Sequence, residues 1–377
     1  MTTSYIQKLR IQGYKCFKDT QFTFKPLQVI VGANGSGKSN LLDFLGMLRE
    51  ISTRGFHKDL LDTGSINSIF HPACNSVLAW EATLHLVPES ITYIGKIQTS
   101  YKHSEETIIK NSATGPETIG TRSRPLEPRT FNDLAAVEGR YHVSLLQSEA
   151  LTKNLYLPSF FILSNTYKSV NISKDQIKVP QLVSDDEMLD EDYKNISSFL
   201  AQLKLRKPTI LTEIESVLAS SIPGFEQFTF RTEFGAGKVM AFYKEKGSNF
   251  EYSLDGLSEG TICLLCWLLI LLNPSEVPRM LLFDEPDLGL HPRTMTLLAA
   301  LIQKASFETQ VIVITHNSYF LSLFEPNNIA VMKREKDNVG YYQVENSKVL
   351  KALLDEDFGG VQELFLTGEL DSFSSDE

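Results

Sequence analysis

The sequence is poor in cysteine and lacks an apolar segment long enough to cross a membrane. Its four cysteines among 377 residues show no spacing typical of a disulfide framework, so a reducing cytoplasm is the expected compartment. The longest apolar run, Ile262–Leu272, is shorter than the roughly 20 residues of a transmembrane helix and predicts a buried helix instead. Cys263 and Cys266 in this run have the Cys-x-x-Cys spacing of two zinc ligands. Because zinc normally needs four ligands and no second Cys or His pair lies nearby, a buried helix face is favoured. The first residues, MTTSYIQKLRIQGY, lack the apolar stretch of a signal peptide.

An excess of positive charge is also missing. The net charge is −10, which argues against a protein that is basic all over its surface. Basic residues nevertheless outnumber acidic ones within residues 1–60, whereas acids gather at 185–192 and toward the end of the chain. DNA binding by a local basic face is therefore left open.

The length predicts two or three packed subdomains. Apolar periodicity and glycine or proline breaks predict strands and helices along most of the chain. The expected strands cover 6–13, a segment from Thr20, 27–31, 76–86, 90–101, 140–147, 225–234, 239–246, 279–283 and 310–315. The expected helices cover 39–49, 185–221, a segment from about Ser258, 292–305 and a segment near Gln362, with a polar hairpin and mobile loop at 103–132 and an acidic tail at 371–377.

The strongest motif is a phosphate-binding loop between a predicted strand and a predicted helix. Residues 32–39 read GANGSGKS, the pattern G-x-x-x-x-G-K-S. Such a loop directs backbone N–H groups at phosphate oxygens, while Lys38 neutralises the β- and γ-phosphates and Ser39 coordinates Mg²⁺. The residues expected to bind ATP here are Asn34, Gly35, Ser36, Gly37, Lys38, Ser39 and Asn40.

A second motif is the apolar strand MLLFDEP, which ends in two adjacent carboxylates. Asp284 is expected to hold Mg²⁺, and Glu285 is expected to orient and deprotonate the attacking water. An apolar strand that ends in carboxylates is common and indicates little by itself. Together with the phosphate loop earlier in the chain, it indicates a nucleotide-binding site.

Two shorter segments narrow the class of protein. LSEGT at 257–261 is expected to open a helix, where Ser258 and the N–H groups near Gly260 can bind an anion. VITH at 313–316 predicts a strand that ends at His316, within reach of a γ-phosphate. Taken singly, Ser258 is interpreted as a helix cap and His316 as a structural histidine.

The order of these four motifs resembles that of the ABC/SMC/RecF superfamily of ATPases. The resemblance implies a Walker A loop at 32–39, a signature at 257–261, a Walker B strand with catalytic Glu285 at 280–285, and a switch histidine at His316. It also implies a homodimer or higher oligomer in which the signature of one head completes the ATP site of the other, with ATP and Mg²⁺ as ligands. Lys38, Glu285 and His316 are the implied catalytic residues, and Ser258 and Gly260 bind the partner's nucleotide.

Further segments resemble the predicted AAA-type ATPases related to OLD proteins. They are GANGSGKSN, the opening IQGYKCFKD, DEPDLGLHP, YKNISSFLAQL with SIPGFEQFTF, and the closing QELFLTGEL. The sequence also departs from these proteins. Unlike ABC-type ATPases, it offers no clear Q-loop glutamine, and DLGL at 287–290 replaces the usual D-loop. It has no heptads for long SMC arms, and no acidic cluster after Thr315 like that of the Toprim nuclease domain of full-length OLD proteins.

The predicted fold is therefore an α/β, ABC-type P-loop ATPase head with a mixed sheet, an antiparallel β subdomain and a short helical insertion. The expected division is an ATPase core at 1–75 and 225–345, a β subdomain at 76–148, a helical insertion at 149–224, and a C-terminal helix and tail at 346–377.

Three functions fit these features. The first is a nucleotide-dependent dimeric switch in phage defence or DNA repair, with a separately encoded nuclease or other effector. The second is a RecF-like DNA clamp or mediator without a nuclease. The third is an ATP-dependent protein scaffold that restrains an effector and does not bind DNA. None of them involves a membrane.

Overall fold

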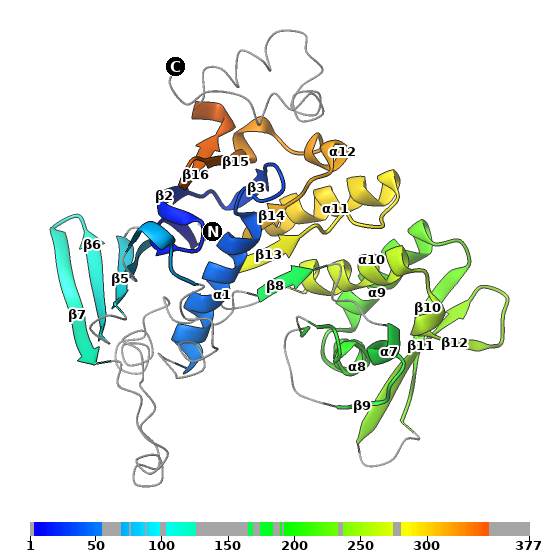
Figure 1. Cartoon of the computed structure of the whole chain (residues 1–377). Helices are drawn as coiled ribbons and strands as arrows, with labels where there is room; N and C mark the ends of the chain where they lie inside the picture. Colours follow the sequence, from blue (N-terminus) through cyan, green and yellow to red (C-terminus); the bar gives the residue numbers. More distant parts are fainter. Residues whose placement is uncertain are drawn as a thin grey trace, which may run out of the picture. The chain divides into compact units, whose positions relative to one another are not determined.

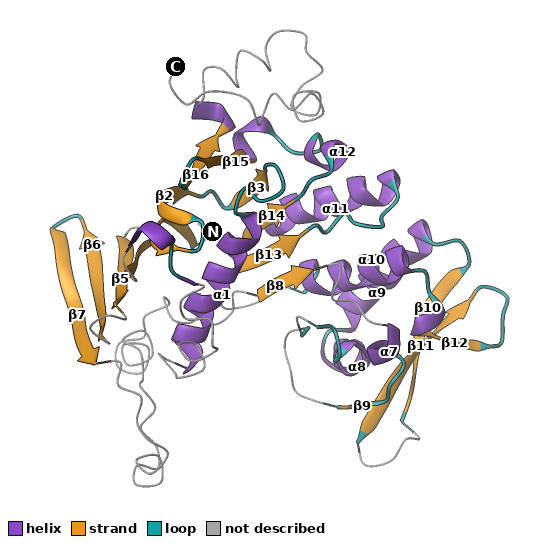
Figure 2. Cartoon of the chain, in the orientation of Figure 1, coloured by secondary structure: helices purple, strands orange, loops and turns teal. Residues whose placement is uncertain are grey.

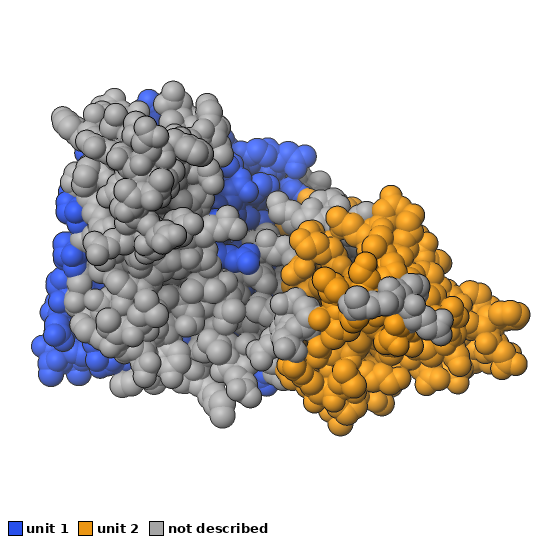
Figure 3. All heavy atoms as spheres, turned by 90° about the horizontal axis from the view of Figure 1, so that it is seen from below, with its two compact units in different colours: residues 1–166, 276–282, 306–377 blue, residues 167–275, 283–305 orange. Residues whose placement is uncertain are grey.

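The computed structural model describes residues 4–54, 69–74, 77–86, 89–98, 103–125, 165–168, 174–183, 189–190, 192–232, 237–273 and 280–346. The chain divides into two compact units, coloured separately in Figure 3. Unit 1 comprises residues 1–166, 276–282 and 306–377, and unit 2 comprises residues 167–275 and 283–305. Each unit therefore combines segments that are distant in sequence. The five-part division expected from the sequence stays a prediction.

Unit 1 contains a six-stranded antiparallel sheet with the order β2-β1-β4-β5-β6-β7. Figure 2 shows β5, β6 and β7 side by side at one end of this sheet. The described connections between neighbouring strands are two-residue turns, at 15–16 between β1 and β2 and at 113–114 between β6 and β7. The hairpin predicted within 103–132 is confirmed over residues 103–125, while 126–132 and the expected strand at 140–147 lie outside the described residues. The strands are β1 (Tyr5–Tyr14), β2 (Phe17–Thr23), β4 (Val77–Leu86), β5 (Glu89–Gln98), β6 (His103–Ser112) and β7 (Gly115–Pro125).

A second six-stranded sheet is mixed and has the order β16-β15-β3-β14-β13-β8. Strand β3 (Leu27–Val31) is parallel to both β14 (Gln310–Ile314) and β15 (Ile329–Glu335), whereas β15 and β16 (Asn338–Gln343) are antiparallel. The remaining strands are β13 (Met280–Asp284) and β8 (Asn165–Lys168). Strands β3 and β14 are buried at every position, which explains their continuous apolar sequences. The predicted mixed sheet is confirmed.

Helix α1 (Lys38–Arg54) forms the centre of the core of unit 1. Its buried side chains share one apolar cluster with residues of both sheets, and Figure 1 shows the helix beside β13 and β14. A helix with apolar contacts on both sides is apolar around most of its circumference. The members on the helix are Leu41, Leu42, Phe44, Leu45, Met47, Leu48 and Ile51.

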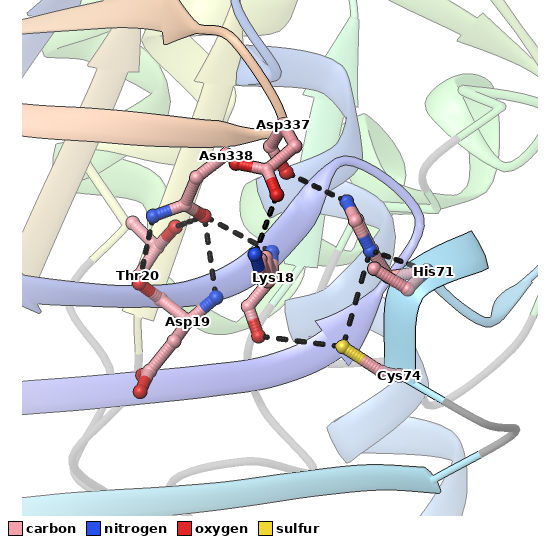
Figure 4. Close-up of polar contacts among 8 residues, drawn as sticks. Lys18, Asp19, Thr20, His71, Cys74, Asp337 and Asn338 are labelled. Atoms are coloured by element: carbon pink, nitrogen blue, oxygen red, sulfur yellow. Dashed lines mark hydrogen bonds and ion pairs between the residues drawn. The ribbon is translucent and has the colours of Figure 1, made fainter.

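Two tight turns of unit 1 are tied together by Asn338 (Figure 4). Its side-chain oxygen accepts hydrogen bonds from Lys18 N at 3.0 Å, Asp19 N at 3.2 Å and Thr20 Oγ1 at 2.9 Å. Its side-chain nitrogen donates to Asp19 O at 2.9 Å. The start of β2 is thereby fixed to the β15–β16 turn, although the two are far apart in sequence.

Further hydrogen bonds connect these two turns to the segment of the short 3-10 helix η1 (Pro72–Cys74). The ring of His71 hydrogen-bonds Asp337 O through Nε2 at 2.7 Å, and Asp337 also pairs with Lys18. Cys74 Sγ of η1 donates to Lys18 O at 3.8 Å, so backbone groups at the start of β2 are bonded both to Asn338 and to η1.

Unit 2 contains a small antiparallel sheet packed with helices. Strand β11 (Lys238–Glu245) pairs with β10 (Phe225–Arg231), β12 (Glu251–Ser253) and β9 (Gln181–Leu182). Its helices are α7 (Lys174–Ile177), α8 (Ile196–Arg206), α9 (Pro208–Ser221), α10 (Glu259–Leu271) and α11 (Pro292–Ala305), with the 3-10 helix η3 at Leu254–Gly256.

The helical stretch expected at 185–221 is corrected in two places. Residues 185–188 and 191 lie outside the described residues; among the described ones the helix begins at Ile196, and it breaks at Lys207 because Pro208 disfavours helical backbone at the preceding residue. Pro208 then starts α9, a position where its missing N–H costs nothing.

Several other elements were not expected from the sequence, among them β15, β16, β12, α12 (Ser318–Leu321), η4 (Pro326–Asn328) and η5 (Val344–Asn346). Their charged residues and short lengths weaken the periodic signal. The segment near Gln362 and the tail at 371–377 lie outside the described residues.

Candidate nucleotide-binding site

The predicted phosphate loop lies between β3 and α1, as its sequence requires. Gly32 follows the last residue of β3, and α1 begins at Lys38. Within the loop, Ser36 N donates to Ala33 O at 3.1 Å. Asn34, Gly35 and Ser39 are exposed, so the N-terminal end of α1 opens to solvent. This is the arrangement by which a helix N-terminus binds a phosphate group.

The ammonium group of Lys38 is held by oxygens of the loop itself. Nζ donates to Gly32 O at 2.7 Å, Ala33 O at 2.8 Å and Ser36 Oγ at 3.2 Å. The residue is only 5% exposed, so its charge is concentrated inside the curve of the loop. An anion bound to the loop would meet this charge, which is the role predicted for Lys38.

Gly37 allows the loop to pack closely against Cys16. Its φ of +103° is one that L-residues rarely adopt, and a β-carbon there would lie 2.9 Å from Cys16 Sγ. The side chain of Asn40 donates to the same sulfur at 3.0 Å. Asn40 therefore supports the loop from the side of the β1–β2 turn, and its predicted contact with ATP stays a prediction.

His316 lies at the same sheet edge as the loop. Strand β14 ends at Ile314, which pairs in parallel register with Ile30 of β3, and Thr315 N donates to Ile30 O at 3.3 Å. His316 is partly buried and follows directly, while Asn317 caps α12 through its side chain. Unit 1 thus brings the phosphate loop and the predicted switch histidine to the ends of two adjacent parallel strands.

The predicted carboxylates belong to unit 2. Asp284 is the last residue of β13, and both Asp284 and Glu285 are partly exposed. Glu285 has a φ of +51°, which a residue with a β-carbon adopts only when its surroundings require it. Leu288 N donates to Glu285 O at 3.1 Å and Leu290 N donates to Asp287 O at 3.1 Å, which shapes the chain after Glu285 into consecutive turns.

The predicted signature begins α10, also in unit 2. Ser258 is exposed and caps the helix, because its Oγ accepts from Thr261 N at 3.1 Å. Lys174 Nζ donates to Leu257 O at 2.9 Å and so fixes the residue before the cap. The prediction that LSEGT opens a helix is confirmed.

A sequence profile described as "AAA domain, putative AbiEii toxin, Type IV TA system" matches residues 95–322, more than half of the chain. A second profile, described as "AAA domain", matches residues 8–48, which include the phosphate loop. The chain belongs to the AAA domain family whose profile matches residues 95–322.

Solved structures show that this AAA protein has the fold of an SMC head. One is the Smc head bound to the C-winged helix domain of ScpA, with a TM-score of 0.58, 17% identity, and coverage of 92% of this chain and 99% of that one. Another is the Smc head domain with an extended coiled coil bound to the C-terminal domain of ScpA, derived from Pyrococcus furiosus. Its TM-score is 0.53 at 16% identity, covering 93% of this chain and 99% of that one. At these identities the likeness concerns the fold.

A comparison with curated proteins gave no match. Neither profile description names OLD proteins, so the resemblance to that branch stays a prediction. Within the described ranges of this AAA protein, no helix is both long and apolar enough to cross a membrane.

Several basic residues near the N-terminus of this AAA protein are paired with acids. Ion pairs join Arg10 to Asp19, Lys15 to Asp43, Lys18 to Asp337, and Lys25 to Glu345. The guanidinium of Arg10 hydrogen-bonds Asp19 and lowers the pKa of that carboxyl. Asp337 and Glu345 lie outside residues 1–60, so these two pairs neutralise part of the positive excess of that segment, which weakens the case for a basic DNA-binding face.

Sequence reasoning missed Cys16, Lys174 and Trp267, which contact the motifs from outside them. Cys16 packs on the phosphate loop and Lys174 holds the residue before the signature cap. Trp267, in the middle of α10, reaches the turn after Glu285. No spacing in the sequence indicates these contacts. Cys263 and Cys266 are buried in α10, which confirms the buried helix expected there.

Proposed function

We propose that this AAA protein binds and hydrolyses ATP and works as a nucleotide-dependent dimeric switch. The observation that carries the proposal is the Lys38 ammonium, held by three oxygens inside a loop at the solvent-facing N-terminus of α1. A fixed cation and a helix N-terminus together favour a polyphosphate. Membership of an AAA family supports the same ligand.

The residue roles follow from the motifs. Lys38 contacts the β- and γ-phosphates, with Asn34, Gly35, Ser36, Gly37 and Asn40 as further loop contributors. Mg²⁺ held with the help of Ser39 and Asp284 would supply charge neutralisation at the phosphates. Glu285 orients and deprotonates water, and His316 stabilises the charge that develops on the transferred phosphoryl group.

A dimer is proposed because the signature residues are presented outward. Ser258 is exposed at the N-terminus of α10, where the helix can bind an anion that belongs to another molecule. Leu288, three residues after Glu285, is 48% exposed and offers an apolar contact near the same turn. We assign Ser258 and Gly260 to the nucleotide of the partner head.

Phage defence is the proposed setting, with a separately encoded effector. The family description names a putative AbiEii toxin and a type IV toxin–antitoxin system, which supports a defence role for this chain. Each Smc head named above was solved with a ScpA domain, which supports partner binding by this head fold. A nuclease is one effector that fits, and DNA repair is the other setting that the motifs allow.

The second candidate function is an ATP-dependent scaffold that binds a partner protein and does not bind DNA. The ion pairs of Arg10, Lys15, Lys18 and Lys25 favour it, because cations already paired with carboxylates release fewer counterions on DNA. A RecF-like clamp would instead need a basic surface open to the duplex.

Steady-state ATP turnover at low salt, with and without linear duplex DNA, tests these proposals. Glu285→Gln serves as the blank, since it removes the base while keeping the size of the side chain. Turnover above the blank supports the ATPase, and its absence contradicts it. Stimulation by DNA favours a DNA-responsive switch or clamp, whereas turnover that ignores DNA favours the scaffold.

A further inference from the structure

Trp267 lies in the interior of unit 2, in the middle of α10. Its side chain is fully buried and packs edge-on against two other rings. The ring centroid of Phe283 is 5.2 Å away at an interplanar angle of 89°, and that of Tyr193 is 6.2 Å away at 78°. Packing against these two rings restricts the indole to one orientation, and this fixes the direction of its N–H.

The indole N–H is directed at the turn that carries Glu285. Nε1 donates a hydrogen bond of 2.9 Å to the carbonyl oxygen of Pro286, the residue directly after the predicted general base. Both partners are buried, so water cannot readily replace the bond if the donor is lost. The hydrogen bond therefore fixes the peptide plane that follows Glu285.

Glu285 needs such a constraint because its backbone is strained. Its φ of +51° is unfavourable for a residue with a β-carbon and persists only where neighbouring contacts impose it. Pro286 restricts the chain on one side, and the bond from Leu288 N to Glu285 O closes the turn. The bond from Trp267 anchors this turn to α10.

We propose that Trp267 is a positioning residue for hydrolysis, acting through the Pro286 carbonyl to hold Glu285 in its strained conformation. This inference rests on the proposed role of Glu285 as general base. The backbone conformation sets the direction in which the Glu285 carboxylate leaves the chain. Loss of the hydrogen bond lets the turn relax toward negative φ, which moves the carboxylate away from the water it must orient.

The same helix begins at the signature, so Trp267 also joins two functional segments of unit 2. Ser258 caps the N-terminus of α10, and Trp267 lies more than two turns further along it. One continuous helix therefore joins the signature cap to the residue that is bonded to the Glu285 turn.

The test removes the hydrogen-bond donor of Trp267 while it preserves the shape of the side chain. Incorporation of the benzothienyl analogue of tryptophan at position 267 substitutes sulfur for N–H and keeps the volume, and Trp267→Phe removes the donor by ordinary mutagenesis. If Trp267→Phe does not fold, the analogue alone decides the outcome. Tyr193→Phe is the matched control, because it removes a polar atom from the same aromatic cluster and keeps the bond to Pro286.

The expected result is a fall in kcat of roughly tenfold to a hundredfold with a nearly unchanged KM for ATP, as for a misplaced catalytic group. Tyr193→Phe is expected to keep wild-type kcat. In a Glu285→Gln background, where turnover is already at the blank, the analogue is expected to leave the affinity for ATP unchanged, because it acts on the hydrolytic step and not on binding.

Unchanged kcat in the analogue protein, beside an active wild type, would overturn the positioning role alone. So would a weakened affinity for ATP in the Glu285→Gln background, which would indicate a structural effect unrelated to the base. Absence of any Glu285-dependent turnover in the wild-type chain would overturn the proposed hydrolysis and this inference with it.

Discussion

Gly260 of the signature packs directly on the backbone of Gly289. A β-carbon at Gly260 would lie 2.7 Å from Gly289 O, closer than such atoms approach in folded proteins. The first turn of α10 and the turns that follow Glu285 are therefore in contact within unit 2. The small side chain at position 260 is required by this approach.

Gly260→Ala is expected to lower ATP turnover strongly. The added methyl group must displace either the start of α10 or the backbone at Gly289, and neither is a flexible side chain that can move aside. We expect a fall in kcat of about tenfold or more, measured by steady-state turnover. Gly256→Ala is the matched control, because a β-carbon there meets only Tyr243 Oη at 3.7 Å and leaves the signature undisturbed. Equal activity of the two variants would contradict the importance of this contact.

Lys38→Ala and Glu285→Gln are expected to have opposite effects on assembly. Removal of the Lys38 ammonium takes away the cation within the loop and prevents ATP-dependent dimerisation. Glu285→Gln preserves binding but stops hydrolysis, so that the ATP-bound dimer accumulates. Sedimentation velocity with ATP and Mg²⁺ should show a larger species only for Glu285→Gln. The same mass for both variants would rule out the ATP-sandwich dimer.

Asn338→Ala is expected to destabilise unit 1 by about 1 kcal/mol, because it removes a side chain bonded to three backbone groups at the start of β2. Asp337→Ala is the comparison, since its ion pair with Lys18 is between exposed side chains and is expected to matter much less. Chemical unfolding of the two variants and the wild type measures the difference. A larger loss for Asp337→Ala would contradict the stabilising role of Asn338.

The four thiols are expected to react slowly in the native protein and faster as the pH rises. Burial disfavours the charged thiolate, which raises the pKa of Cys16 and Cys266 and brings that of Cys263 to about 11. A thiol with that pKa is only about one-thousandth thiolate at pH 8, and the thiolate is the reactive form. Cys74, the least buried, should react first with a chromogenic disulfide, and Cys74→Ser should remove this phase. Rapid reaction of three or more thiols at pH 8 without denaturant would contradict the buried environments.

Much of the local structure is encoded in short stretches of sequence. Strand β3 and helix α11 have the predicted bounds, because a run of buried apolar residues and a clean amphipathic period give unambiguous signals. The expected helix start at Ser258 is also confirmed, since a serine cap acts through its own neighbours. The hairpin β15–β16 and the break at Lys207 were missed or misplaced, because charged strands and a single proline alter a pattern that depends on longer windows.

Short-range signals in the sequence are sufficient to predict the phosphate loop, the order of the motifs and the residues proposed to carry the chemistry. These depend on glycine conformation, helix starts and side-chain type, all of which act within a few neighbouring residues. The tertiary structure, in contrast, is needed to show that Cys16 packs on Gly37, that Gly260 contacts Gly289, and that Trp267 hydrogen-bonds Pro286. It alone decided the strained backbone of Glu285, because the local preference of a glutamate opposes a positive φ and contacts from distant residues must impose it.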